Sequence, residues 1–223
     1  MALVRVWDLP TRVFHWALVA AVVTLVITGN IGGNWMVWHM RAGYLVGALL
    51  LFRLVWGLGG GHWSRFSTFV PTPVGLWRYL KGDGQPHPPL GHNPLGALSV
   101  LAMLTLLTLQ VASGLVSDDE IAFTGPLYAL VSGQVSSWAT WYHKDIGKLG
   151  LVALVVLHLL ALAYYRVFKQ RRLVSAMLSG DQETPQVSPR ASDDSWATRL
   201  LAVALFAACM GLMVWVASLG QGF

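Results

Sequence analysis

Two histidines lie within one strongly apolar stretch of this chain, where an imidazole is costly to bury. The stretch Trp141–Arg166 reads WYHKDIGKLGLVALVVLHLLALAYYR and contains His143 and His158, fifteen residues apart. An α-helix rises about 1.5 Å and turns about 100° per residue, so the two rings would lie roughly 22 Å apart on nearly the same face. Imidazole nitrogens bind metal ions and transfer protons. One helix is therefore predicted to contribute to two separate sites.

The composition indicates a membrane protein. Hydrophobic residues make up 55% of the 223 residues and charged residues only 11%, whereas soluble domains carry about 25% charged residues. The net charge of +5 predicts no nucleic-acid partner, because the basic residues flank apolar segments. The single cysteine, Cys209, excludes an internal disulfide, a covalent Cys-x-x-Cys-His haem attachment and a cysteine-ligated iron–sulfur cluster.

Five apolar runs are long enough to span the hydrocarbon core of a bilayer. They are Val13–Ile31, Met40–Leu58, Leu95–Val116, Ile146–Val167 and Trp196–Leu219. The predicted fold is therefore an all-α integral membrane protein, with a four-helix core over residues 1–178 and an additional transmembrane helix over 196–223. The polar residues 179–195 are expected to form a flexible cytoplasmic linker. Short interfacial helices are expected over 72–82 and 169–178, the second with its basic residues facing anionic headgroups.

The charges of the connections predict the orientation in the membrane. Basic residues are concentrated before the first run, between the second and third runs, and after the fourth run. The connection between the first two runs has no charge, and the connection after the third begins with the acidic sequence SDDE at 117–120. Because basic loops stay in the cytoplasm, we expect a cytoplasmic N-terminus and a periplasmic C-terminus.

This orientation sorts four histidines into two pairs. His15 and His158 fall in the cytoplasmic half of the membrane, and His39 and His143 fall in the periplasmic half. Haem iron accepts a neutral imidazole on each face of the macrocycle, and apolar space between helices can hold the porphyrin. The pattern therefore predicts a haem-binding four-helix bundle with two bis-histidine haems.

Small residues and cations are needed around such a cofactor. The glycines expected to lie near the macrocycle, unless they serve ordinary helix packing, are Gly43, Gly47, Gly147 and Gly150. Haem propionates attract cations near the membrane surfaces. Arg12 and Arg53 are candidates at the inner haem and Arg41 and Lys144 at the outer one, although each could instead be an ordinary interfacial residue.

Two other classes of protein use intramembrane histidines. One is a proton-coupled or metal-ion transporter with a histidine relay, but the first four runs contain no acidic residue and no internal proline. The other is a zinc or copper protein. Tetrahedral zinc requires ligands that converge on one point, whereas roughly 22 Å of helix separates His143 from His158.

Four segments resemble the bacterial cytochrome b561 family, which includes the b-type cytochrome subunits of nickel–iron hydrogenases. The segments are Val4–Trp16, His39–Gly57, Gly91–Leu115 and His143–His158, and the likeness extends over about residues 4–181. The first-helix sequence VRVWDLPTRVFHW and the sequence GHNPLG are the distinctive motifs. The resemblance implies two haem b groups, with helices 1 and 4 ligating the inner haem and helices 2 and 4 the outer one.

The resemblance also implies a function and a location. Electrons would pass between a membrane quinone and a periplasmic redox partner, such as a hydrogenase or a c-type cytochrome, across the bacterial inner membrane. The chain would act as an electron-transfer subunit, and a quinone oxidoreductase activity of its own stays open, as does a homodimer. The fifth helix resembles that of the longer, hydrogenase-type members and suggests packing or partner docking.

The remaining histidines lie in connections. In GHNPLG, Asn93 is expected to cap a helix whose first residue is Pro94. His92 is a candidate contact for a haem propionate or a quinone carbonyl. His62 and His87 lie in sequences rich in glycine and proline and are expected to be solvated.

Overall fold

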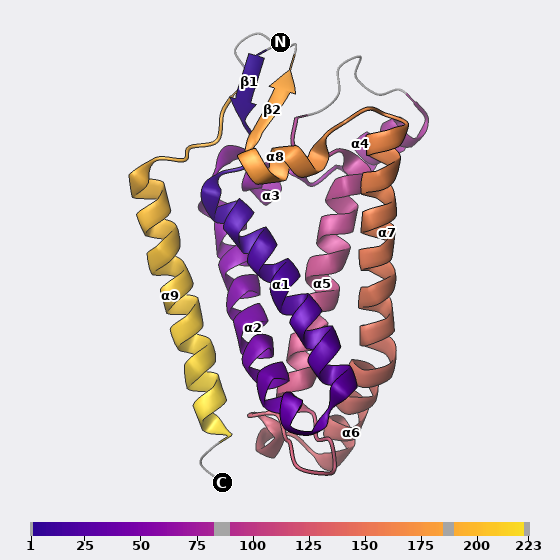
Figure 1. Ribbon diagram of the computed structural model, residues 1–223, viewed down its shortest axis with the longest axis vertical. Helices are drawn as coiled ribbons and strands as arrows, with labels where there is room; N and C mark the ends of the chain where they lie inside the picture. Colours follow the sequence, from indigo (N-terminus) through magenta and orange to yellow (C-terminus); the bar gives the residue numbers. More distant parts are fainter. Residues whose placement is uncertain (1, 83–89, 185–189, 221–223) are drawn as a thin grey trace. The chain divides into compact units, whose positions relative to one another are not determined.

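The computed structural model describes residues 2–82, 90–184 and 190–220. The long helices are α1 (Leu9–Ile31), α2 (Met36–Gly59), α5 (Pro94–Val116), α7 (Lys148–Val167) and α9 (Trp196–Leu219). The shorter helical segments are η1 (Gly33–Trp35), η2 (His62–Ser64), α3 (Phe66–Phe69), α4 (Pro73–Leu80), η3 (Tyr128–Leu130), α6 (Gly133–Trp141), η4 (Tyr142–Gly147) and α8 (Leu173–Ser179). Two strands, β1 (Ala2–Arg5) and β2 (Asp181–Thr184), complete the described elements (Figure 1).

Within the described residues, five helical spans are long and apolar enough to cross a membrane. They are Leu9–Ile31, Gly33–Gly59, Pro94–Val116, Gly133–Val167 and Trp196–Leu219. The predicted all-α membrane fold is confirmed. The expected start of the fourth helix was wrong, because α6 and the π-helical segment η4 continue directly into α7 (Figure 1). His143 therefore lies inside a helix rather than at its start.

Side-chain caps begin α5, where the sequence predicts one, and α4. The amide of Gly96 donates to Oδ1 of Asn93 at 2.7 Å, which confirms the cap of α5. Thr72 caps α4 in the same way by accepting from the Gly75 amide at 3.1 Å. Both predicted short helices are present, although α8 begins only at Leu173.

The chain divides into two compact units, each containing parts of the helical spans. The first unit consists of Met1–Val13, Arg53–Ala102 and Val155–Ala202. The second unit consists of Phe14–Phe52, Met103–Leu154 and Val203–Phe223. The division places His158 in the first unit and His15, His39 and His143 in the second.

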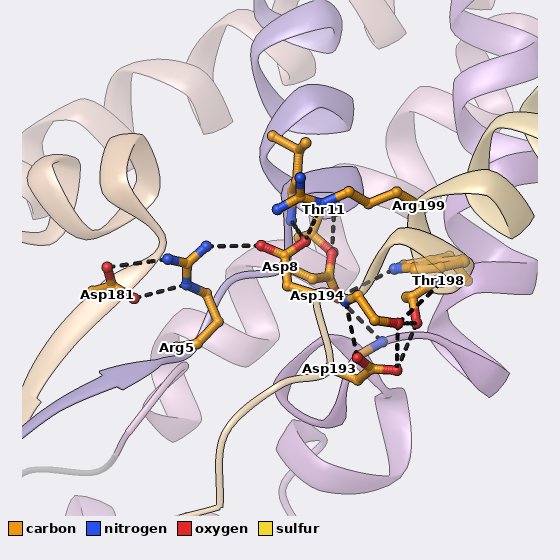
Figure 2. Close-up of polar contacts among 12 residues, drawn as sticks. Arg5, Asp8, Thr11, Asp181, Asp193, Asp194, Thr198 and Arg199 are labelled. Atoms are coloured by element: carbon orange, nitrogen blue, oxygen red, sulfur yellow. Dashed lines mark hydrogen bonds and ion pairs between the residues drawn. The ribbon is translucent and has the colours of Figure 1, made fainter.

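In the first unit, the N-terminal residues pair with the segment expected to be a flexible linker. Strands β1 and β2 are antiparallel, with Arg5 opposite Asp181. The Arg5 guanidinium contacts Asp181 at 2.7 Å and Asp194 at 2.7 Å, and Arg199 contacts Asp194 at 3.1 Å (Figure 2). Ser192 donates its amide to the carbonyl of Arg5 at 2.7 Å.

The expectation of flexibility over 179–195 was therefore wrong for much of the described part of that segment. Its polar, proline-bearing composition predicted a flexible linker, because composition alone carries no information about a partner. Arg5, which precedes Asp181 by 176 positions, supplies the opposite charge, and the pairing orders the chain. The proposed division into domains at 178 and 195 stays a prediction.

Substitution of Asp194 by Asn is expected to destabilise the first unit by about 1–2 kcal/mol, because hydrogen bonds to the carboxylate are lost. The pKa of this carboxyl is lowered, since burial, which would raise it, is outweighed by hydrogen bonds from Arg199, the Leu9 amide and Arg5. A carboxyl whose pKa is lower in the folded than in the unfolded protein stabilises the fold fully when the pH is above its unfolded pKa of about 4. This stabilisation is lost as the pH falls through the lowered pKa of the folded state.

Thermal unfolding in detergent at neutral pH measures the effect of Asp194→Asn. Asp193→Asn is the matched control, because among the described residues Asp193 bonds to Ser195 and Thr198, both within five positions of it. Figure 2 shows Asp193 beside Thr198. Equal melting temperatures for the Asp194 variant and the wild type would contradict the account.

The start of α1 is fixed by a buried carboxylate in the first unit. Asp8 is 0% exposed. Its Oδ1 accepts the amide of Thr11 at 2.7 Å, and its Oδ2 accepts the amide of Gly61 at 3.1 Å and the hydroxyl of Ser64 at 3.0 Å. A Cβ at Gly61 would overlap Asp8 Oδ2, so this close approach requires glycine.

In the second unit, α9 packs against α2. The rings of Phe52 and Phe206 lie 6.2 Å apart. A Cβ at Gly47 would lie 2.7 Å from the terminal methyl of Met213. Gly47 was expected near the macrocycle but instead lets α9 approach, so the fifth helix has a packing role.

Candidate functional site

His39, in the first turn of α2, lies against α1 within the second unit. Its Nδ1 is 3.0 Å from the carbonyl oxygen of Leu25 and 3.4 Å from the hydroxyl of Thr28. A Cβ at Gly29 would lie 3.0 Å from the imidazole. One carbonyl, one hydroxyl and one glycine on a single helix face therefore hold the ring.

His143, in η4, has the same set of contacts on α5. Its Nδ1 is 2.9 Å from the carbonyl oxygen of Gln110 and 3.3 Å from the hydroxyl of Ser113, and a Cβ at Gly114 would lie 3.0 Å from the ring. The two contact sets occupy identical spacings in the sequences LVITG (25–29) and QVASG (110–114). This short repeat is the signal from which these residues could have been found.

The carbonyl contacts fix the tautomer of both rings. A carbonyl oxygen only accepts hydrogen bonds, so Nδ1 of each neutral ring carries the proton and donates it. The lone pair then lies on Nε2, the nitrogen left to bind a metal ion. A backbone carbonyl bonded to the other ring nitrogen is the usual support of a metal-ligating histidine.

The distance between the rings suits one metal ion between them. The ring centroids of His39 and His143 are 6.0 Å apart, and the ring planes are inclined at 80°. An imidazole nitrogen lies about 2 Å from the metal it binds, so two imidazoles on opposite sides of one ion have centroids roughly 6 Å apart. The structure thus brings together the pair predicted for the outer site, while their role as haem ligands stays a prediction.

The two rings line a cavity of about 360 Å³ in the second unit. Its apolar lining comes from α1, α2, α5 and α7, and includes Val22, Leu107 and Leu151. Gly43 also lines it, and a Cβ at this position would meet nothing within 4 Å. A large apolar ring between helices needs this kind of open space, so the residues present fit a haem.

The other glycines expected beside the macrocycle serve helix packing instead. A Cβ at Gly147 would overlap the side-chain oxygen of Gln110, and one at Gly150 would lie 3.3 Å from Leu106. The Gln110 amide group donates to the carbonyl of His143 at 3.0 Å. Gly147 therefore allows Gln110 to hold the π-helical backbone, and π-helical turns of this kind are frequent at functional sites.

Cations line the same cavity. Lys144 was predicted to contact an outer propionate and does line it, together with Lys148, which sequence reasoning missed. Arg41, the other predicted cation, is absent from the lining, and its guanidinium lies 5.0 Å from the ring centroid of Trp38. The spacing of four residues between the lysines was the available signal, because it places them on one helix face.

Gly43→Leu is expected to reduce the haem content by about half while leaving the protein folded, because leucine is a better helix former and would fill the open space. Gly59→Leu is the matched control, since a Cβ at Gly59 also meets nothing within 4 Å and Gly59 lies outside the cavity lining. A pyridine haemochrome assay against protein concentration measures the ratio. Full haem content in the Gly43 variant would show that the cavity is not the haem site.

In the first unit, Arg53 and His92, both predicted to contact a haem propionate or a quinone, lie near the ring of Phe69. The guanidinium of Arg53 lies 4.8 Å from the ring centroid of Phe66 and 5.8 Å from that of Phe69, and the His92 ring lies 4.8 Å from Phe69. Arg53 is only 3% exposed, and its Nη1 has no hydrogen-bond partner among the described residues. A buried cation with an unpaired nitrogen fits an anionic group such as a propionate.

The other predicted residues lie as follows. Arg12 donates from Nη1 to the carbonyl of Leu178 at 2.6 Å and so holds α8. His15 packs against Trp16, with ring centroids 5.0 Å apart. Because His15 and His158 belong to different units, their pairing stays a prediction. His62 packs against Trp63 in η2, and His87 lies outside the described residues.

Two imidazoles facing one apolar cavity, in an all-α protein with five candidate membrane spans in its described part, fit the class of b-type membrane cytochromes. The chain belongs to the prokaryotic cytochrome b561 family, whose model matches residues 6–180. It is therefore a multi-pass membrane protein that binds haem b and transfers electrons.

Curated relatives cover most of the chain. A protein from Bradyrhizobium diazoefficiens, named a probable Ni/Fe-hydrogenase B-type cytochrome subunit, is 24% identical over 217 residues, which covers 81% of this chain and 86% of the relative. A protein of the same name from Azotobacter chroococcum is 26% identical over 215 residues, 79% and 87% of the two chains. The probable Ni/Fe-hydrogenase 1 B-type cytochrome subunit of Escherichia coli K12 is 21% identical over 210 residues, 78% and 88%. No solved structure matches the chain.

Proposed function

We propose that this protein holds two haem b groups, one near each membrane surface, and carries electrons between a periplasmic redox protein and membrane quinone. His39 and His143 would ligate the outer haem, and His15 and His158 the inner one. The observation that carries the proposal is the outer pair, whose rings donate Nδ1–H to the carbonyls of Leu25 and Gln110 and stand 6.0 Å apart.

The residues of the outer site have separate tasks in this proposal. The carbonyls fix the tautomer and the orientation of both imidazoles, and hydrogen bonding at Nδ1 makes Nε2 a stronger donor to iron. The apolar lining keeps water from the cofactor, and Lys144 and Lys148 would bind its propionates. When bound, haem supplies the reversible one-electron chemistry of its iron.

The partner and the orientation follow from two further observations. The relatives are named hydrogenase cytochrome subunits, so a nickel–iron hydrogenase is the proposed periplasmic partner. The basic connections support a cytoplasmic N-terminus and a periplasmic C-terminus. At the inner site, Arg53 and His92 would contact a propionate or a quinone carbonyl.

The rival function, a metal-ion transporter, has less support. In the ranges 2–82, 90–184 and 190–220, no group of three or more His, Cys, Asp or Glu side chains is placed to hold a metal ion. A pair of imidazoles without a third ligand suits haem, since the porphyrin nitrogens complete the coordination of the iron.

Electron transfer through proteoliposomes tests the function. The vesicles would contain the oriented protein, a membrane-impermeant oxidant inside and an impermeant reductant outside. Oxidant is expected to be consumed at a rate that depends on the haem-loaded protein and rises when a quinone is added. Consumption equal to that of vesicles with haem-free protein would contradict a transmembrane electron path. Proton or metal-ion uptake without electron transfer would favour the transporter instead.

A further inference from the structure

The chain reverses sharply after α7 in the first unit, and the turn is held by specific contacts. Gln170 has a left-handed backbone with φ of 53°, and its side-chain amide donates to the carbonyl of Val167 at 2.7 Å. The amide of Arg171 donates to the carbonyl of Tyr165 at 3.0 Å. This reversal returns Arg171 and Arg172 to the last turn of α7, where Arg166 lies.

These three arginines line a cavity of about 490 Å³ between the end of α7 and the start of α8. Arg166, Arg171, Arg172 and Ser175 form the polar part of the lining, and Leu162 and Leu173 belong to its apolar part. The cavity thus combines three guanidinium groups with an apolar wall. It lies in the first unit and is separate from the cavity of the histidine pair.

Among the described residues, no carboxylate forms an ion pair with these three arginines. The ion pairs within those parts of the chain are made by Arg5 and Arg199. Burial raises the pKa of Tyr79, a neighbour on α4, to about 12, so this phenol is neutral and offers no negative charge. Three like charges around one space repel each other and attract an anion.

The position of the cavity indicates the kind of anion. The membrane span that contains α7 ends at Val167. Arg166 therefore lies in its last turn and the other two arginines follow it, where lipid headgroups are expected. Leu159 is 57% exposed and lies three and seven residues before Leu162 and Arg166, so α7 has an exposed apolar residue on the face that lines the cavity. Guanidinium groups bind phosphate through paired hydrogen bonds. Basic pockets at the cytoplasmic ends of membrane helices are a recognised type of acidic-lipid site.

We propose that this cavity binds the headgroup of an anionic phospholipid. The phosphate would contact Arg166, Arg171 and Arg172, the glycerol would contact Ser175, and the acyl chains would lie along the apolar face of α7. Free inorganic phosphate has the same charged group but no acyl chain to contact the apolar wall, so the lipid is the expected ligand. The site is independent of the haem assignments.

Titration of the delipidated, haem-loaded protein with short-chain phosphatidylglycerol, followed by native mass spectrometry, tests the proposal. The double variant Arg171→Gln/Arg172→Gln is expected to bind about thirtyfold more weakly, since each basic residue contributes about fivefold to affinity for acidic lipid. Phosphatidylcholine of the same chain length is expected to bind more weakly than phosphatidylglycerol. Arg172→Lys should weaken binding less than removal of the charge.

The matched control is Arg78→Gln/Lys81→Gln, which removes two positive charges from the α4 region outside the cavity lining. This control should bind phosphatidylglycerol as the wild type does, and all variants should keep the wild-type haem spectrum. Equal weakening by both double variants would mean diffuse attraction and would overturn the site. Equal binding of the two lipids, or full competition by millimolar inorganic phosphate, would also overturn it.

Discussion

The His39→Ala protein is expected to keep one haem b and to lose the other, so that about one haem per chain remains where the wild type holds about two. The reason is local. His39 and His143 face each other across one cavity at 6.0 Å, and removal of one imidazole leaves iron with a single protein ligand and an open coordination position. The inner site uses neither residue. Haem content and electron paramagnetic resonance of the ferric protein measure the loss.

His62→Ala is the control for this result, because His62 packs on Trp63 in the first unit and lines neither cavity. It should retain both low-spin ferric signals. If His39→Ala and His15→Ala removed the same signal, the assignment of pairs by membrane side would be wrong.

His158→Ala is expected to stop electron flow between the two membrane faces. His15 would then be the remaining protein ligand of the inner haem, which should become high-spin and bind carbon monoxide, or be lost. The outer haem should stay low-spin, because the contacts of His143 with Gln110 and of His39 with Leu25 are unchanged. Resonance spectra with and without carbon monoxide, beside the proteoliposome assay, measure both effects.

Two unchanged low-spin signals in the His158 variant would show that His158 is a packing histidine. The shared role of the fourth span in both sites would then be incorrect. Low-spin signals of normal intensity together with abolished electron transfer would also contradict this shared role, because the proposal attributes the loss of electron transfer to a change at the inner haem.

The helical spans were predictable because hydrophobicity is a local property of the sequence. Runs of apolar residues predicted all five spans, and Asn93 with Pro94 predicted the start of α5. The grouping of His39 with His143 was also predictable, since the positive-inside rule assigns each span end to one side of the membrane.

Other features depend on contacts between distant residues and could not be predicted. The order of the segment around Asp194 requires Arg5, 189 positions away. The extension of the fourth span to Gly133 requires a helix through the polar sequence WYHKDIGK, whose π-helical backbone is held by Gln110 on α5. A hydrophobicity pattern ends at these polar residues, although the hydrogen-bonded helix does not.

The side chains around the cofactor were predicted only in part. Lys144 could be predicted as a propionate contact from its expected position near the membrane surface. The sequence could not show that Lys148 lines the cavity and that Arg41 does not, because this depends on the path of the backbone. Glycines were equally ambiguous. Gly43 leaves open space, whereas Gly47 admits Met213, and the two positions are one helical turn apart.

The ratio of haem b to polypeptide in fully loaded, purified protein tests the central claim most directly. Acidic acetone should extract all of the haem, because a single cysteine cannot form a Cys-x-x-Cys-His attachment. About two haem b per chain are expected, both low-spin with two imidazole ligands. A ratio of one haem per chain, or a high-spin spectrum for the loaded protein, would contradict this claim.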